Sequence, residues 1–477
     1  MANRSWGILI SSPATYERFR IALHDLGFHY TVSTVGCYSS PNPKLDPLYL
    51  FNALQHVINQ HPALALQIRG RNGPAPYFIR LPQLYLSKVV EFRDVEEHHL
   101  LSEDTRRKVV ENLLSEQNSK GFNDEYLPLW RIIVLNLGAS RISPGFHQHA
   151  VAFIWHHIIA DGKSGQAMHY AILQGLNSTS AHKHNISKAC TMIPSTTPLL
   201  PSMDEVFSYP TSWSVWFQKL FGRLLPRGYS PSRRWTGAPH HFENNPKTLI
   251  RLIELSKPVT FTLLALSRKN KTSMTAFLQA IVGMVLFEHL PEAEQLRCST
   301  AIELRRFLPK KYGIDETKIG LWIDGWQQDF QRGNLVNESA RRDGVSWNEA
   351  RRNKTRIDYE ISKGQSDLSF GALRGISDFK LGLLGMIGNV RQNSYSIVNL
   401  GLCAGTSKND DYWKLDTMVI SQSAHVNGSA IQFCVVSTQA GGMTISLNWQ
   451  EGTVTEEFVD SIVGDLKQRL VSLGNYS

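Results

Sequence analysis

A run of apolar residues that ends in two adjacent histidines constrains this chain more than any other segment. Ala150–Trp155 has the composition of a buried strand, and Gln166–Leu176 has the pattern of a helix. His156 and His157 lie where this strand gives way to a loop. A loop held between a strand and a helix can hold polar side chains rigidly, so the junction is the first candidate for a functional site.

The residue types at this junction favour proton transfer. A neutral imidazole has a pKa near ~6.5, so it can take up a proton at neutral pH and return it, and we predict that His157 is a general base. Asp161 and Gly162 favour a tight turn after the histidines, because aspartate and glycine tolerate turn conformations. We expect Asp161 to anchor the loop by pairing with a cation elsewhere in the chain.

Two familiar motifs have a different spacing. Gly162–Ser164 resembles the end of a phosphate-binding loop, but the first glycine of that loop would fall at His157. The segment Asp161–Gly165 lacks the GxSxG spacing that surrounds a nucleophilic serine. We therefore predict neither a phosphate-binding loop nor a serine nucleophile here.

A structural histidine and a metal site are two further interpretations of the pair. A single histidine after a strand is most often structural, but two histidines followed by aspartate and glycine favour a functional role. His156, His157 and Asp161 could hold zinc, yet adjacent residues of a strand point to opposite faces and rarely bind one ion. We expect no metal at this site.

The pattern HHxxxDG at residues 156–162 resembles the hallmark of a superfamily of acyltransferases. This superfamily contains chloramphenicol acetyltransferase, the condensation domains of nonribosomal peptide synthetases, the plant BAHD enzymes and the fungal alcohol acetyltransferases. Three segments add to the resemblance, namely the PLxR-like Pro128–Arg131, the SNxG-like Ser394–Gly401 and the late strand Ile445–Glu451. The DFGWG motif of the plant enzymes is missing from the sequence, so the chain is most similar to the alcohol acetyltransferase branch.

The resemblance implies an α/β (α+β) fold of two chloramphenicol acetyltransferase-like lobes, with a tunnel between them and His157 near its middle. It also implies an acyl-CoA-dependent O-acyltransferase of secondary metabolism. Such an enzyme moves an acyl group, in the first place acetyl, from coenzyme A to a hydroxyl of a small hydrophobic acceptor. Acetyl-CoA is then a co-substrate, and no bound cofactor is expected.

The resemblance also assigns roles to individual residues. His157 and Asp161 are the expected catalytic residues, and Ser396 and Asn399 are candidates for the donor that stabilises the oxyanion. The residues expected near the acceptor and the acyl donor are His156, Gly162, Ser396 and Asn399.

Three other functions remain compatible with the sequence. The acyl group could come from a carrier-protein thioester, as it does in condensation domains. The tunnel could serve a pericyclase or cyclase that transfers no acyl group. The protein could also bind a lipid or an acyl-CoA without catalysis, although the intact His157 and Asp161 argue against this.

Composition restricts the class of protein but not its reaction. The chain has 477 residues, of which 42% are hydrophobic and 19% charged, as in a globular protein. Its net charge of +9 suits an anionic partner such as the phosphates of coenzyme A, and the cations are dispersed, so we expect no nucleic-acid partner. The five cysteines are odd in number and widely spaced, which predicts a reduced, cytoplasmic protein. We expect a monomer.

The length of the chain fits two domains of ordinary size. We predict an N-terminal lobe at 1–200, a linker or crossover at 201–246 that is rich in Ser, Thr, Pro and His, and a C-terminal lobe at 247–477. Within the linker, Trp213–Leu225 has the pattern of an aromatic-rich helix, which we expect to pack against the body rather than to contact a membrane surface.

Local patterns predict most of the remaining elements. Asp46 and Pro47 have the residue types that start a helix, and this helix should end before Pro62. The resemblance places the strand before Arg69 beside the active site, so Arg69 is one candidate partner for Asp161, and Arg131 is another. Strands are expected in the second half at Leu249–Leu255, Cys298–Leu304, Ser394–Leu400, Leu415–Ser421, Ala430–Ser437 and Met443–Trp449.

Overall fold

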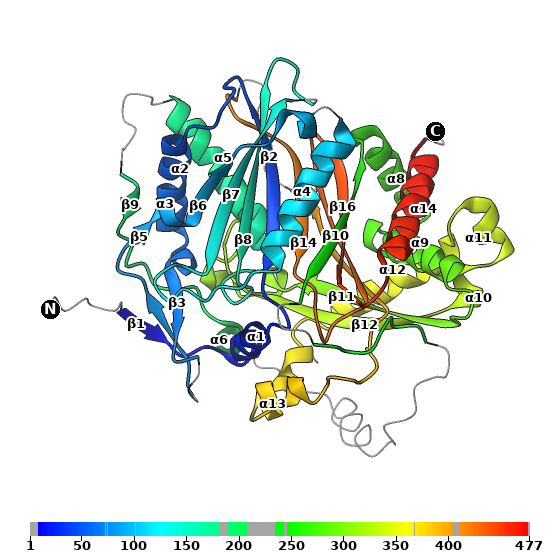
Figure 1. Cartoon of the computed structure of the whole chain (residues 1–477). Helices are drawn as coiled ribbons and strands as arrows, with labels where there is room; N and C mark the ends of the chain where they lie inside the picture. The colour runs from blue at the N-terminus through cyan, green and yellow to red at the C-terminus, as the bar shows by residue number, and fades with distance from the viewer. Residues whose placement is uncertain are drawn as a thin grey trace.

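The computed structural model describes residues 8–71, 73, 75–100, 102–140, 142–181, 189–207, 234–242, 246–366, 368–403 and 411–475. Two large β-sheets lie at the centre, and helices cover their outer faces (Figure 1). Each sheet has its own apolar core. The predicted helix at Trp213–Leu225 lies outside the described residues.

The first sheet carries the histidine motif and has five strands. The central strand β8 is antiparallel to both of its neighbours, β2 and β7, and its residues from His149 to Trp155 are buried. The order across this sheet is β14 (Lys414–Gln422), β2 (Val32–Ser40), β8 (His147–Trp155), β7 (Trp130–Ala139) and β6 (Val90–Arg93).

Helices α2 (Pro47–Gln60) and α5 (Gly162–Ala181) pack together on one side of this sheet, and α4 (Glu103–Asn118) lies on the other (Figure 1). Helix α2 begins as the sequence predicted, because the Asp46 side chain accepts a hydrogen bond of 2.8 Å from the Leu48 N–H. Helix α5 starts directly after the histidine motif, so the motif is held between β8 and α5.

The second sheet has six strands and belongs to the C-terminal half. Strands β11, β13 and β15 are parallel to one another, and the other pairs are antiparallel. The order is β10 (Thr248–Leu255), β16 (Gly442–Gln450), β15 (Ile431–Thr438), β13 (Tyr395–Leu402), β11 (Gln295–Glu303) and β12 (Ile323–Gln331).

The four long helices of the C-terminal half gather on one face of this sheet (Figure 1). Helix α9 (Met274–His289) is apolar on almost every side and buried, because α8 (Lys257–Lys269), α12 (Trp347–Ser362) and α14 (Glu456–Asn475) surround it. The Ser273 side chain caps its first turn by accepting a hydrogen bond from the Ala276 N–H.

One strand of the C-terminal half belongs to the sheet of the N-terminal half. Strand β14 comes from the C-terminal half but pairs antiparallel with β2, with Val419 opposite Val35 (Figure 1). Its buried residues Met418 and Ile420 join the core of the first sheet. The segments 1–200 and 247–477 therefore share one sheet, and the interface between the lobes contains continuous hydrogen-bonded structure.

Shorter elements surround the two sheets. They are β1 (Ile8–Ser11), α1 (Thr15–Asp25), β3 (Leu66–Arg69), β4 (Tyr77–Arg80), β5 (Leu84–Tyr85), α3 (Leu86–Val89), β9 (Thr191–Met192), α6 (Met203–Val206), α10 (Arg332–Leu335), α11 (Glu338–Asp343) and α13 (Phe379–Leu384). Within the described ranges, none of the helices combines the length and the apolar character that crossing a bilayer requires. The architecture confirms the predicted α/β fold of two lobes.

Candidate active site

His157 is held in one orientation by the turn that follows it. Its Nδ1 atom lies 2.9 Å from the carbonyl oxygen of Ala160. A carbonyl can only accept, so Nδ1 carries the proton and Nε2 keeps its lone pair. The same carbonyl accepts a hydrogen bond of 2.8 Å from the indole of Trp155, which fixes its position in turn. The predicted general base therefore has a defined tautomer.

His157 is neutral in this environment. Burial lowers the pKa of the His157 imidazole well below its ordinary value, and the positive charge of Arg20 acts in the same direction. The hydrogen bond to Ala160 opposes both effects, since it favours the imidazolium, but it is the smaller influence. The ring is thus available to accept a proton across the neutral pH range.

A cavity of about 1230 Å³ reaches His157 from between the two lobes. From the first half of the chain, His157, Gly162 and Arg20 contribute to its wall, and from β13 Ser396 and Asn399 do so. The structure thus brings together four of the residues that the sequence analysis selected, although Ser396 and Asn399 are more than two hundred positions away from the histidines along the chain.

Gly162 allows the turn to approach the second lobe closely. A Cβ atom at this position would lie 2.8 Å from a terminal methyl group of Leu400 and 3.2 Å from that of Ile420. Both neighbours are buried. A larger residue at position 162 would therefore require a shift of the Leu400 side chain or of the start of α5.

Asn399 has a fixed orientation at the cavity wall. Its Nδ2 atom donates a hydrogen bond of 3.1 Å to the Thr275 hydroxyl, and its Oδ1 atom accepts one of 2.8 Å from the Gly401 N–H. Gly401 has a positive φ of 70°, a conformation that glycine adopts readily. The irregularity of β13 after Asn399 and the contact with Thr275 therefore hold its amide in place.

His156 faces away from this cavity. Its ring stacks on His24 with centroids 4.4 Å apart, and its Nδ1 atom accepts a hydrogen bond of 3.1 Å from the Ile158 N–H. His156 does not contribute to the cavity wall. The two histidines thus point in different directions, as the alternation of side chains at the end of a strand leads one to expect.

Asp161 is an anchor of the turn, as the sequence analysis predicted. It is fully buried, and its carboxylate accepts hydrogen bonds of 2.8 Å and 3.1 Å from the guanidinium of Arg305. The hydroxyl and N–H of Ser164 and the N–H of Trp322 add three more. Every oxygen of the carboxylate is engaged, so Asp161 fixes the turn but does not face the cavity.

Both partners that the sequence analysis had named for Asp161 were wrong. Arg69 pairs with Glu125 at 3.3 Å, and Arg131 donates to the side chain of Gln117 and to the carbonyl of Lys120. Arg305 follows β11 in the other half of the chain. The sequence contains no local signal for this pair, because only the packing of the lobes brings the two residues together.

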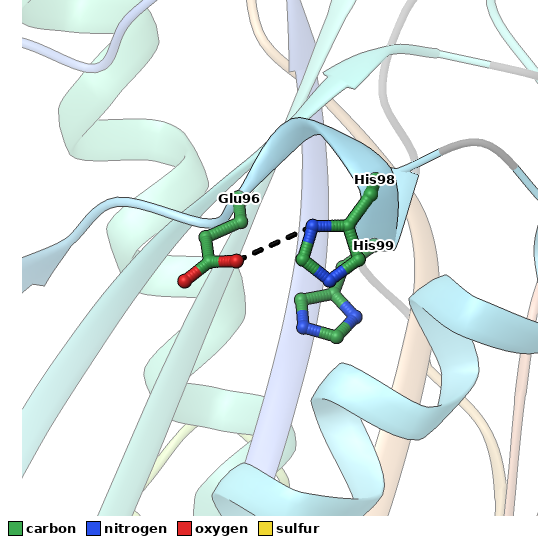
Figure 2. A group of neighbouring side chains, drawn as sticks. All are labelled: Glu96, His98 and His99. Carbon is green, nitrogen blue, oxygen red and sulfur yellow. Dashed lines mark ion pairs between the residues drawn. The ribbon is translucent and has the colours of Figure 1, made fainter.

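The three side chains considered as zinc ligands do not converge. Among the described residues, the only set of three potential ligand atoms within 4.8 Å of one another belongs to Glu96, His98 and His99. Figure 2 shows this set on an exposed turn, with Glu96 and His98 forming an ion pair of 3.3 Å. It lies outside the cavity that His157 lines.

A group of basic side chains near His157 was not predicted from the sequence. The ring of His29 lies close to those of both His157 and His425, with centroid distances of 5.7 Å and 4.0 Å. Nε2 of His425 lies 3.4 Å from Nη1 of Arg20. Burial and the charge of Arg20 lower the pKa of His425 to about 3, so this imidazole is neutral. No motif marks these residues, and His425 lies about 400 positions after Arg20 and His29 in the chain.

Comparisons with known proteins place this chain in a family. The chain matches the family model described as "Alcohol acetyltransferase" over residues 17–470. It is 25% identical over 466 residues to the probable alcohol acetyltransferase crmB of Aspergillus fumigatus, covering 94% of this chain and 97% of that protein. It is 24% identical over 491 residues to the probable alcohol acetyltransferase FCK4 of Fusarium pseudograminearum, covering 98% and 96%.

Two solved structures have the same fold. The TRI3 trichothecene 15-O-acetyltransferase from Fusarium sporotrichioides superimposes with a TM-score of 0.69 at 12% identity, covering 98% of this chain and 94% of that one. The condensation domain of the Monacolin K polyketide synthase MokA superimposes with a TM-score of 0.58 at 11% identity, covering 98% of each chain. Since the family model spans nearly the whole sequence, the chain belongs to the alcohol acetyltransferase family.

Proposed function

We propose that this protein transfers an acyl group, in the first place acetyl, from coenzyme A to the hydroxyl of a small-molecule acceptor. The observation that carries this proposal is the neutral His157, whose Nε2 atom is free of the Ala160 contact while the residue lines a cavity between the lobes. Family membership supports acyl transfer as the reaction class.

The first step is attack of the acceptor oxygen on the thioester carbonyl. An alcohol is a weak nucleophile at neutral pH, so a base must remove its proton as the bond forms. Nε2 of His157 takes this proton, and general-base assistance of this kind contributes about 10²- to 10⁴-fold to the rate. The Nδ1 hydrogen bond to the Ala160 carbonyl stabilises the imidazolium that results.

The second step is collapse of the tetrahedral intermediate. The carbon–sulfur bond breaks, the imidazolium of His157 gives its proton to the departing thiolate, and the products are an ester and free coenzyme A. The thioester is already activated, so no covalent acyl-enzyme is required. Ser396 and Asn399 on β13 are our candidates for stabilising the oxyanion, because both line the same cavity as His157.

Asp161 acts through the turn and not on the substrate. Its carboxylate binds Arg305, while its own N–H donates to the Gly320 carbonyl at 2.9 Å. These contacts hold the backbone at Ala160, whose carbonyl orients His157. We propose that Asp161 is a positioning residue.

The test is turnover by the purified protein with acetyl-CoA and a panel of alcohols, followed by release of free thiol and by mass spectrometry of the ester. A His157→Ala variant should lose about 10²- to 10⁴-fold in kcat with unchanged folding. His98→Ala is the matched control, since His98 is exposed on a distant turn and should leave turnover unchanged.

The donor is tested separately. Acetyl-CoA and an acetylated carrier protein should be compared at equal concentration, and we expect coenzyme A to be the better donor. Equal turnover by folded wild-type and His157→Ala proteins would contradict the role of His157. Tight binding of acyl-CoA without release of thiol for any acceptor would contradict the transferase proposal.

A further inference from the structure

Arg20 differs from the other cations that line the cavity. Within the part of the chain that the structure describes, three cationic side chains contribute to the wall: Arg20, Lys163 and Arg297. Lys163 forms an ion pair with Glu316 at 3.5 Å, and Arg297 forms one with Asp329 at 2.6 Å. Among the described residues, Arg20 has only the Tyr16 hydroxyl and the His425 imidazole as hydrogen-bond partners. Its charge is therefore not balanced by a carboxylate.

The environment of Arg20 makes this imbalance costly. Arg20 is only 8% exposed, and its Nε atom is buried with no hydrogen-bond partner. Removing a guanidinium from water without an opposite charge is unfavourable unless a bound group supplies that charge. Glu17, one turn earlier in α1, does not supply it, because its carboxylate accepts from the Ala14 N–H instead.

The neighbours of Arg20 hold it in one position. The guanidinium carbon lies 4.9 Å from the centre of the Tyr16 ring, and Nη2 donates to the Tyr16 hydroxyl. On the other side, Nδ1 of His425 lies 3.2 Å from the amide oxygen of Asn427, which leaves Nε2 to accept from Arg20. A guanidinium fixed in this way is suited to bind a planar anion through parallel N–H groups.

We propose that Arg20 binds a carboxylate on the acceptor, so that the preferred acceptors are hydroxy acids, with Tyr16 and His425 orienting the guanidinium. Arg20 and His157 line the same cavity, so a small molecule bound there can present its hydroxyl to His157 and its carboxylate to Arg20. The phosphates of coenzyme A lie at the far end of the pantetheine arm from the thioester, which makes them less suitable occupants. This inference rests on the proposed acyl transfer.

The experiment compares hydroxy acids with their methyl esters. A panel with increasing separation between hydroxyl and carboxylate is tested with acetyl-CoA, and each acid is paired with its uncharged ester. For the best acid we expect a kcat/KM about 10- to 100-fold above that of its ester, mainly through KM, because charge-assisted hydrogen bonds to the carboxylate are lost in the ester. Wild-type protein alone suffices for this comparison.

Variants test whether Arg20 is responsible. Arg20→Met should reduce the acid-to-ester ratio to about 1, and Arg20→Lys should retain part of the preference because the charge remains. Lys163→Met is the matched control, since Lys163 lines the same cavity but already has Glu316 as a partner, and it should leave the ratio unchanged. Circular dichroism and thermal unfolding establish that each variant is folded.

Each result separates the carboxylate subsite from the reaction. A ratio near 1 in the wild-type protein for every acid overturns the subsite, and equal loss of acid and ester turnover in Arg20→Met assigns Arg20 to the oxyanion instead. If no acceptor is acylated, binding of the same acids and esters is measured by calorimetry. Acid-selective binding that depends on Arg20 would then support the subsite and contradict the transferase proposal. Binding that ignores the carboxylate overturns the subsite as well.

Discussion

Nη1 of Arg305 lies 2.8 Å from Oδ2 of Asp161, although the two residues are 144 positions apart in the chain. Both side chains are buried, and the guanidinium also lies over the ring of Trp322 at 4.8 Å. The pair connects the turn after the histidines to the end of β11 in the other half. It therefore ties the orientation of His157 to the packing of the two lobes.

Removing Arg305 should destabilise the protein strongly. Arg305→Ala leaves the carboxylate of Asp161 buried without a counter-charge, and we expect a loss of about 3–5 kcal/mol in the free energy of unfolding, measured by urea denaturation. Arg352→Ala is the control, because Arg352 is 68% exposed and its pair with Glu349 should contribute less than about 1 kcal/mol. A loss at Arg305 no larger than that at Arg352 would contradict the anchoring role.

The pH dependence of turnover should follow the low pKa of His157. A base whose pKa lies well below its ordinary value stays unprotonated at neutral pH, so kcat/KM should be constant between about pH 6.5 and 8 and fall only under more acidic conditions. Arg20→Met should move this acidic fall to higher pH, because the positive charge of Arg20 lowers the pKa of His157. A rise in kcat/KM with a midpoint near pH 6.5 in the wild-type protein would argue against a buried, neutral base.

Stability should fall on acidification because buried histidines are neutral in the folded protein. Below about pH 6.5 the unfolded chain binds protons at these residues, whereas the folded protein binds them only at far lower pH. In this range each such histidine therefore lowers the free energy of unfolding by about 1.4 kcal/mol for every pH unit of acidification. Burial lowers the pKa to about 4 for His61, His149 and His169, and to about 3 for His425.

Five of the described carboxyl groups have a raised pKa and act in the opposite sense over part of this range, against nine described histidines with a lowered pKa. Burial raises the pKa of Glu17 to about 7 and that of Asp324 to about 6, so their contribution to stability is lost as the pH rises. The histidines outnumber them, and urea midpoints should decrease from pH 7 to pH 5. A folded His149→Gln variant should show a shallower decrease, whereas replacing the exposed His98 and His99 should not change it.

Two glycines inside helices should respond oppositely to alanine. A Cβ at Gly175 in α5 would lie 2.8 Å from the Cα of Ala53 in α2, so Gly175→Ala should lower the free energy of unfolding by about 1–3 kcal/mol through overpacking. Nothing lies within 4 Å of a Cβ at Gly464 in α14, so Gly464→Ala should raise the free energy of unfolding by about 0.5–1 kcal/mol, because alanine has the higher helix propensity. Denaturant titration of both variants checks this, and a change of the same sign at both positions would contradict the close approach of α2 and α5.

Local sequence patterns predicted the elements better than their arrangement. The start of α2 at Pro47 followed from a capping aspartate and a proline, both of which act on their immediate neighbours. The strand expected at Leu415–Ser421 is present as β14, but nothing in its alternation indicated that it joins the sheet of the N-terminal half. Strand pairing depends on residues far away in the chain, so a pattern read along one segment does not contain it.

The histidine motif alone was enough to identify His157 as the candidate base, because the strand, the turn and the helix that hold it are consecutive in the chain. Three features became apparent only in the folded molecule: the partner of Asp161, the pairing of β14 with β2, and Arg20, which lies beside His425 without a carboxylate partner. Each of these depends on which surfaces of the two lobes meet, and that is decided by burial and hydrogen bonding between segments more than a hundred residues apart.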